Sequence, residues 1–451
     1  MLFISFRFIL FTVFAVFGSL FVQRFFNQRS YIGFILFCNY LFYFVWNWKY
    51  GVLLFLLTLL SYFSALGSKR KWINTIGVGL IFALLCFFKY HHFFIGMDGM
   101  ETLNIVIPLG VSFYSLEMIG YLLDVRNGKS EAQRDFLSFA AYISFFPKIV
   151  SGPITKANDI IEQWNKGDKI LLKDIETGLQ IMAIGYFKKM VIADRLGVFV
   201  NDVFAAPKAF HWLTILLALL SYSIQIYMDF SGYSDIAIGC ANCLGIKMHR
   251  NFDLPYASAS ITEFWRRWHI SLSGWFKEYV YIPMGGNRKG LLRQCINLMF
   301  VMILSGMWHG AKVTFILWGV INGLFLCLEK TINKQKRDKG LINRLLTLSA
   351  IVFSWIFFRA GSIKDALEII GCVLSFQSGI VQPYLWSFFA FGVVSFYGLY
   401  CERKTKGENI HAIYPIQNLD TVYGLTVFLI FVGLVLCLAY TEVSPFVYAA
   451  F

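Results

Sequence analysis

Long apolar runs separated by short polar and basic segments dominate the chain. A helix that crosses a bilayer needs about 20 mostly apolar residues. The clearest candidates are Phe3–Val22, Tyr31–Trp48, Tyr50–Gly67, Trp72–Phe88, Phe210–Met228, Cys295–Gly310, Val313–Leu328, Leu345–Phe358, Tyr384–Tyr400 and Val422–Tyr440. Shorter runs, or runs richer in Gly and Pro, are Ile105–Leu123, Phe136–Ile154, Thr177–Phe187 and Ile236–Leu244. Such runs suit re-entrant or buried half-helices that protein encloses.

The pattern predicts an all-α, polytopic integral membrane protein. We expect about ten to twelve transmembrane helices, with re-entrant or interfacial helices between them. Phe3–Val22 lacks a basic leader and a small-residue cleavage motif, so we interpret it as a retained first helix. We predict a single domain over residues 1–451, with the informative motifs within about 105–329 and flanking helices in 1–104 and 330–451.

Composition supports membrane insertion and excludes other classes. Hydrophobic residues make up 58% and charged residues 15% of the 451 residues, whereas soluble proteins average about 45–50% and about 25%. The net charge of +14 would suggest nucleic acid in a soluble protein. Here the basic residues form short clusters between apolar runs, which predicts cytoplasmic loops and no nucleic-acid partner. These clusters are Arg24/Arg29, Lys69–Lys71, Lys330–Arg344 and Arg403–Lys406.

The cysteines do not indicate a metal site. Cys240 and Cys243 form a lone C-x-x-C pair inside an apolar run. A zinc or redox site would need a second ligand pair or a thioredoxin-like setting. We therefore interpret both as buried helix thiols and predict no metal.

Ionisable residues inside membrane segments are costly and are functional candidates by default. Asp229 and Asp235 follow the apolar run Phe210–Met228. They are six residues apart, so a straight helix would not place them on one face, and Gly232 could break the helix between them. The alternative is that both aspartates cap helix ends or pair with nearby arginines.

Aromatic and basic residues alternate through Ile261–Asn287. Such an amphipathic stretch suits the membrane–water interface, and a helix there could simply lie on the cytoplasmic surface. The alternative is that Arg266 or Arg267 binds an anionic donor, because guanidinium groups suit phosphate and carboxylate.

His309 lies late in an apolar run, beside Trp308 and between Gly306 and Gly310. An isolated membrane histidine usually makes a hydrogen bond between helices. However, imidazole is also the side chain best suited to proton transfer near neutral pH, and small neighbours permit a close approach. From residue type and spacing alone, the structural and catalytic interpretations remain equally open.

Taken together, five segments resemble the membrane-bound O-acyltransferase (MBOAT) family, and within it the bacterial branch of alginate O-acetyltransferase-like proteins. The segments are GLQIMAIGYFKKMVIADRL, QIYMDFSGYSDIAIG, NFDLPY, ITEFWRRWHISLSGWFKEYVYIPMGGNRKG and GMWHGAKVTFILWG. Their order and spacing cover about Ile105 to Glu329, half of the chain. Tyr279–Asn287 favours this branch over the one that transfers D-alanine to teichoic acid.

The resemblance implies a ring of helices around a tunnel, with the family's histidine at a constriction. That residue maps onto His309, and a second family histidine, secondary or structural in role, maps onto His269. We further predict substrate- or cofactor-binding roles for Trp308, Asp229, Asp235, Arg266, Arg267, Asn251, Trp265 and Asn322. Relatives often carry W-G-x-x-H-G where this chain has Asn322 in place of histidine, and Lys312 and Val313 stand where an aromatic is common.

The implied reaction is acyl transfer from a thioester to a hydroxyl. The implied donor is acetyl-CoA or an acyl carrier protein thioester, used as substrate, with no bound cofactor. The acceptor would be an extracytoplasmic polysaccharide, reached with a periplasmic or cell-surface acetyltransferase partner, from the bacterial inner (cytoplasmic) membrane. The same fold could instead transfer D-alanine or a fatty acyl group. A glycan transporter is less favoured, because transporters usually carry an internal repeat and none stands out here.

Overall fold

The computed structural model describes residues 3–95, 106–332, 340–404 and 418–440. Helices make up the regular structure of these residues, apart from one isolated bridge between Phe210 and Ile380. The prediction of an all-α protein is confirmed. The described chain separates into two compact units, Met1–Gly185 with Tyr233–Arg250, and Tyr186–Gly232 with Asn251–Phe451. The single domain over 1–451 remains a prediction.

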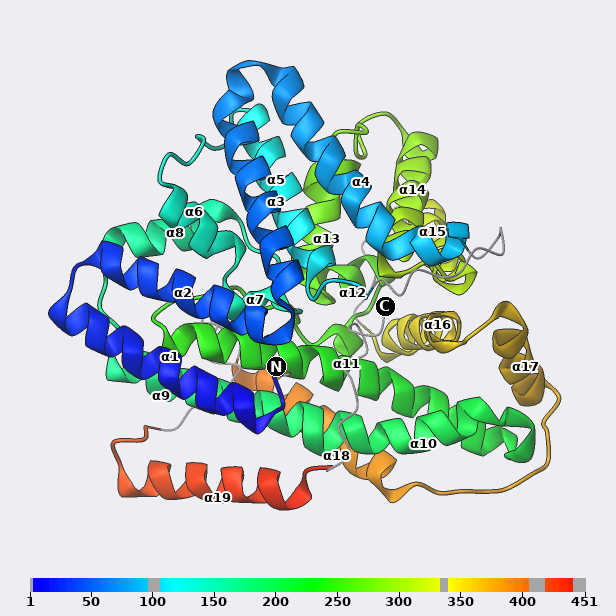
Figure 1. Ribbon diagram of the computed structural model, residues 1–451. Coiled ribbons are helices and arrows are strands. Elements are labelled where there is room, and N and C mark those ends of the chain that lie inside the picture. Colours follow the sequence, from blue (N-terminus) through cyan, green and yellow to red (C-terminus); the bar gives the residue numbers. More distant parts are fainter. Residues whose placement is uncertain (1–2, 96–105, 333–339, 405–417, 441–451) are drawn as a thin grey trace. The chain divides into compact units, whose positions relative to one another are not determined.

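The first unit contains the N-terminal helices. They are α1 (Phe6–Phe25), α2 (Gln28–Trp46), α3 (Trp48–Leu66), α4 (Lys71–Ile95), α5 (Val111–Arg126), α6 (Phe136–Ile143), α7 (Phe146–Ile149), α8 (Ala157–Lys166) and α9 (Leu172–Tyr186). Consecutive helices from α1 to α5 pack against one another (Figure 1). The side chains of Phe6 and Phe17 on α1 are 71% and 67% exposed. Large exposed aromatics of this kind indicate a lipid-facing surface rather than a soluble one.

A buried ion pair lies inside the first unit. Lys148 donates a hydrogen bond to Glu117 of α5. The other carboxylate oxygen of Glu117 accepts the backbone N–H of Thr155 at 2.9 Å. Buried charges are costly unless they are paired and hydrogen-bonded. This pair therefore ties the loop that follows α7 to α5.

The second unit contains α10 (Asp194–Ala205), most of α11 (Trp212–Cys243), α12 (Ile261–Arg267), α13 (Ile270–Phe276), α14 (Leu291–His309), α15 (Val313–Ile332), α16 (Leu341–Arg359), α17 (Ile363–Leu374), α18 (Leu385–Lys404) and α19 (Val422–Leu438). Two π-helical segments, η2 (Phe187–Ala193) and η5 (Lys277–Tyr281), continue α9 and α13. Short 3-10 turns are η1 (Gly67–Lys69), η3 (Pro207–Ala209) and η4 (Pro255–Ala257).

Seven helices in the described part of the chain are long and apolar enough to cross a membrane. They are α1, α3 with η1, most of α4, α11, α14, α15 and α16, and the shorter apolar helices are Phe136–Ile149, Leu385–Phe396 and Val422–Leu438. The protein is therefore a multi-pass membrane protein. The predicted span Tyr31–Trp48 forms the helix α2 but is not one of the seven. Phe136–Ile154 is divided between the short helices α6 and α7.

One expectation about α11 is wrong. Gly232 does not break it, because α11 is one helix of 32 residues that joins the predicted segments Phe210–Met228 and Ile236–Leu244. A single helical glycine costs only about 1 kcal/mol relative to alanine. The buried residues on both sides of Gly232 offset that cost through packing. Cys240 and Cys243 lie buried near the end of this helix.

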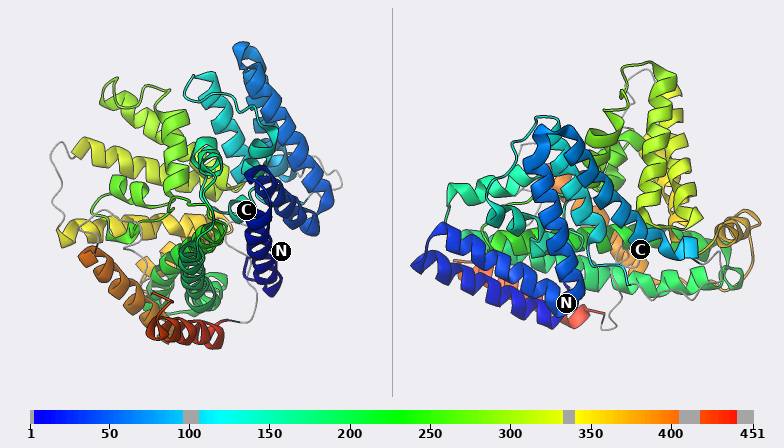
Figure 2. Two further views of the ribbon diagram at one scale, coloured as in Figure 1. Left: turned by 90° about the vertical axis from the view of Figure 1, so that its left-hand side faces the viewer. Right: turned by 45° about the horizontal axis from the view of Figure 1, so that its top comes forward.

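The pair α14 and α15 forms the tightest helix contact of the second unit (Figures 1 and 2). A Cβ atom on Gly306 would overlap the carbonyl oxygen of Phe315. A Cβ atom on Gly319 would overlap the carbonyl oxygen of Met302 and lie 3.0 Å from the Cα of Ile303. The two backbones are therefore in direct contact, as small residues permit between membrane helices.

We predict that Gly319→Ala destabilises the protein. Alanine favours a helix over glycine by about 1 kcal/mol, but the added methyl group would have to push α14 away, and overpacking costs about 1–3 kcal/mol. The measurement is the thermal midpoint of the purified protein in detergent.

Gly79→Ala is the matched control, because Gly79 is a helical glycine with open space where a Cβ would stand. We expect the midpoint to fall by several degrees for Gly319→Ala, and to stay equal or rise for Gly79→Ala. Equal midpoints for the two variants would refute the backbone contact.

Candidate active site

His309 is the last residue of α14, and its side chain is 4% exposed. Four aromatic rings surround the imidazole. The ring centroids of Trp308, Trp318, Phe358 and Phe315 lie 5.0, 5.2, 5.1 and 6.3 Å from that of His309. Phe315 and Trp318 come from α15, and Phe358 from α16, so three helices position the predicted base. We call His309 and these four rings the histidine cage.

A second aromatic layer supports the histidine cage. Trp355 of α16 stacks on Trp318 at 6.0 Å with an angle of 15° between the rings. Trp355 also contacts Trp268 at 5.1 Å, and its indole N–H donates to the hydroxyl of Tyr256 at 3.3 Å. Trp355, Trp318 and Trp268 are each 1% exposed. Because interiors of this kind are close-packed, the rings have little freedom to move.

His269 lies between the short helices α12 and α13 in a left-handed conformation with φ 43°. This geometry corrects the expectation of one amphipathic helix over Ile261–Asn287, because α12 ends at Arg267, α13 begins at Ile270, and Trp268 between them is buried. The left-handed region is unfavourable for a residue with a Cβ. Backbone strain of this kind persists only where the surroundings enforce it.

Hydrogen bonds to Asn251 enforce the left-handed conformation of His269. The side-chain oxygen of Asn251 accepts the backbone N–H of Ser271 at 3.1 Å and the hydroxyl of Ser271 at 2.9 Å. The same oxygen lies 3.2 Å from Nδ1 of His269. Because a backbone N–H can only donate, the atom on Asn251 is an acceptor, so Nδ1 of His269 carries the proton. The lone pair of this imidazole is then on Nε2.

Burial lowers the pKa of His269 from 6.5 to about 3, so the ring is neutral at physiological pH. Phe230 of α11 contacts the ring edge-on at 4.6 Å. Trp308 lies 6.2 Å from His269 and 5.0 Å from His309, between ring centroids. The structure therefore brings the two predicted histidines to the same site, where both are neighbours of Trp308.

Asp229 belongs to a buried ion cluster. Nζ of Lys189 lies 2.6 Å from Asp229 of α11 and 2.7 Å from Asp194 of α10. Lys189 and Asp194 are five residues apart, which in an α-helix would separate them by about 140°. The π-helix η2 brings them together, since the N–H of Asp194 bonds to the carbonyl of Lys189. The expected arginine partner of Asp229 is a lysine in the structure.

The predicted site residues on α12 lie in different environments. Trp265 packs against Trp318 at 5.5 Å, next to the histidine cage. Arg267 pairs with Glu263 of its own helix at 2.7 Å, whereas Arg266 is exposed. The backbone N–H of Thr262, in the first turn of α12, donates to Glu329 of α15 at 3.2 Å.

Two further predicted residues lie on long helices. Asn322 is fully buried on α15, and its side-chain amide donates to the carbonyl of Trp318 at 2.9 Å. It thus lies one helical turn from the histidine cage. Asp235 is buried on the part of α11 that belongs to the first unit. The substrate-side roles of these residues remain predictions.

Two features of the site were not predicted from the sequence: the buried Lys189, and the aromatic rings that α16 contributes. The paired lysines in GYFKKM within an apolar stretch were a signal for a buried cation. Trp355 and Phe358 are three apart and share a helix face, but that spacing cannot reveal which residue they face.

We predict a pH signature for His269. Between pH 6.5 and 3 the unfolded chain binds a proton at this position that the folded chain does not, so the free energy of unfolding falls as pH falls through that range. His269→Asn removes this contribution, and asparagine tolerates the left-handed conformation. The loss of thermal midpoint between pH 7 and pH 5 should therefore be smaller in the variant than in the wild type.

His249→Asn is the control, because His249 is exposed. Its thermal midpoint should follow the pH dependence of the wild type. If His269→Asn did the same, the neutral buried state of His269 would be disproved.

Comparisons with known proteins identify the family to which the chain belongs. The membrane-bound O-acyltransferase family matches residues 129–364. The chain is 33% identical to a probable alginate O-acetylase, AlgI, of Pseudomonas putida over 92% of this chain and 94% of the relative. It is 36% identical to a peptidoglycan O-acetyltransferase of Helicobacter pylori, covering 73% and 71% of the two chains.

A teichoic acid D-alanyltransferase of Bacillus subtilis is 29% identical over 57% of this chain and 68% of the relative. The extent of the alginate O-acetylase match and the span of the family match lead to one assignment. The chain belongs to the membrane-bound O-acyltransferase family and is a membrane O-acyltransferase.

Proposed function

We propose that the protein moves an acetyl group from a cytoplasmic thioester across the membrane to a hydroxyl acceptor, for O-acetylation of an extracytoplasmic polysaccharide, with His309 as the general base. The hydroxyl oxygen attacks the thioester carbonyl while His309 removes the hydroxyl proton. The new C–O bond forms, the C–S bond then breaks, and the proton held by His309 passes to the departing thiolate. Acetyl-CoA is the favoured donor, and an acyl carrier protein thioester is the alternative.

The observation that carries this proposal is the burial of His309 inside the histidine cage. A base must hold one position within hydrogen-bonding reach of the acceptor oxygen, about 3 Å away. The four rings hold the imidazole and exclude water, which would otherwise hydrolyse the thioester. His269 has its Nδ1 proton committed to Asn251 and its pKa far below neutral, which favours a supporting role for this second histidine.

The oxyanion of the tetrahedral intermediate needs a hydrogen-bond donor. The backbone N–H of Gly310, next to His309, is already bonded to the carbonyl of Met307 at 3.1 Å. We propose that the indole N–H of Trp318 is the donor. It is buried, and among the described residues it meets no hydrogen-bond acceptor. A buried donor without an acceptor is costly unless a ligand completes it.

The names of the relatives support acetyl as the transferred group. Two relatives at 33% and 36% identity are acetylating proteins, whereas the D-alanyltransferase is 29% identical. D-alanine and fatty acyl groups remain alternatives that the mass of the ester formed would distinguish. We further propose that the protein works in the bacterial inner membrane and that a separate periplasmic or cell-surface acetyltransferase completes transfer to the polysaccharide. A tunnel that leads to His309 remains a prediction.

We predict that His309→Ala abolishes acetylation while the protein remains folded. General-base catalysis contributes about 10²–10⁴-fold, so acetyl ester on the surface polysaccharide should fall by at least 100-fold. The measurement is mass spectrometry of glycans from intact cells, in which any partner protein is present.

His249→Ala is the matched control, because it removes an exposed histidine. Both variants should be inserted in the membrane at wild-type levels. Near-normal acetylation by His309→Ala would exclude His309 as the base.

A second prediction concerns the oxyanion donor. Trp318→Phe keeps an aromatic ring in the cage but removes the N–H, so kcat should fall by about 10²–10³-fold with little change in KM. Trp355→Phe is the matched control, because the N–H of Trp355 already donates to Tyr256. Its kcat should stay within a few-fold of the wild type. Equal effects of the two changes on kcat would reduce Trp318 to a packing role.

A further inference from the structure

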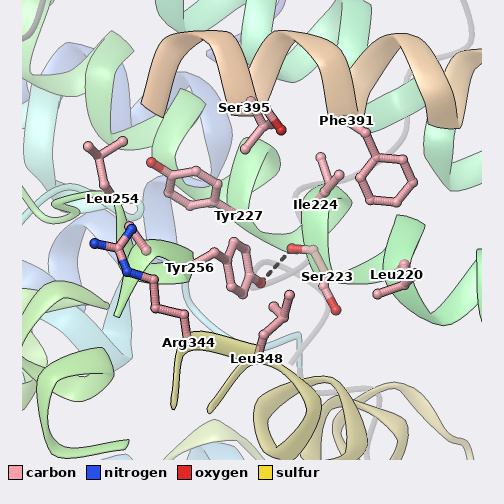
Figure 3. Close-up of a pocket in the computed structure, with 12 residues that line it drawn as sticks. Leu220, Ser223, Ile224, Tyr227, Leu254, Tyr256, Arg344, Leu348, Phe391 and Ser395 are labelled. Atoms are coloured by element: carbon pink, nitrogen blue, oxygen red, sulfur yellow. Dashed lines mark hydrogen bonds between the residues drawn. The ribbon is translucent and has the colours of Figure 1, made fainter. Parts of the chain in front are cut away.

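A cavity of about 410 Å³ lies in the second unit, away from the histidine cage (Figure 3). Three helices and the η4 segment line it. Leu220, Ile224 and Tyr227 form one face of α11, Phe391 belongs to α18, and Arg344 belongs to α16. The volume is within the range of about 300–1,000 Å³ that is typical of small-molecule sites.

The cavity has a polar end and an apolar end. In Figure 3 the guanidinium of Arg344 and the hydroxyl of Tyr227 lie toward Leu254, whereas Phe391 and Leu220 lie on the opposite side of the view. Leu220 and Tyr227 are seven residues apart on α11, which corresponds to about 10 Å along the helix. The cavity is therefore long enough to separate a charged group from a hydrocarbon tail.

The wall between the two ends offers little polarity. The hydroxyl of Tyr256 donates to the carbonyl of Ser223 at 2.6 Å and accepts the indole N–H of Trp355. These bonds occupy the tyrosine hydroxyl within the protein. A water-soluble ligand would lose its hydration along such a wall without replacement, which is unfavourable.

The charged end lies where lipid headgroups are found. Arg344 is in the first turn of α16, a candidate span that begins at Leu341. A residue at the end of a membrane-spanning helix lies near the bilayer interface, and basic pockets between such helices bind anionic lipid headgroups. Guanidinium groups suit phosphate because they donate two parallel hydrogen bonds.

We propose that this cavity binds one anionic phospholipid, with its phosphate at Arg344 and an acyl chain along Leu220, Ile224 and Phe391. The occupant is a structural lipid and not the acyl donor. Its chain contacts Tyr256, which Trp355 connects to Trp318 in the histidine cage. Bound lipid therefore supports the wall behind the predicted base.

The test uses the full-length protein, exchanged into a mixture of equal amounts of phosphatidylglycerol and phosphatidylcholine. Native mass spectrometry then identifies the lipid that is retained most tightly. The wild type should retain at least fivefold more phosphatidylglycerol than phosphatidylcholine. Arg344→Gln should reduce this ratio to about one, and Arg344→Lys should keep part of it, because lysine still binds phosphate as a point charge.

Two further variants separate the contribution of the acyl chain of the lipid from that of its headgroup charge. Ser395→Phe fills the cavity from α18 and should lower retention of both lipids at least fivefold. Arg288→Gln removes an exposed arginine outside the cavity and should leave the ratio unchanged. The proposal is overturned if Arg344→Gln behaves like Arg288→Gln, if Ser395→Phe retains both lipids, or if excess glycerol 3-phosphate alone displaces the lipid.

Discussion

The direct backbone contact between α14 and α15 is the constraint on which the site depends. Gly306 and Gly319 place the two helices so close that no side chain fits between them. The turn from His309 to Val313 is consequently short, and the imidazole meets Phe315 and Trp318 of the returning helix. Without a hydrophobic effect between helices inside lipid, such close packing is the main way to hold them together.

The two histidines of the site are held by different means. A directional hydrogen bond to Asn251 and a left-handed backbone fix His269 in one tautomer. Aromatic faces and edges surround His309 instead, which restrains the position of the ring. The division between a reacting His309 and a supporting His269 remains a prediction.

The sequence predicted local features well and distant pairings poorly. Apolar runs long enough to cross a membrane correctly located α1, α3, α4, α14, α15 and α16. The length and hydrophobicity of such a helix can be recognised without any knowledge of tertiary contacts. The conformation of His269 could not be predicted, since Asn251 enforces it from 18 residues away. The rings of Trp355 and Phe358 behind His309 likewise depend on how α16 packs. The expected helix break at Gly232 is wrong, because packing of the buried neighbours outweighs the low helix propensity of a single glycine.

The cluster around Lys189 bears on the order in which buried charges find their partners. Asp194 is synthesised only five residues after Lys189, and the π turn lets the two side chains meet within the same helix. Lys189 therefore has a counter-charge within its own helical segment before α11 is made, which lowers the cost of burying it. Asp229 is made 40 residues later, on α11, and docks onto a cation that is already in place. The π turn thereby gives Lys189 a charge partner that does not depend on α11.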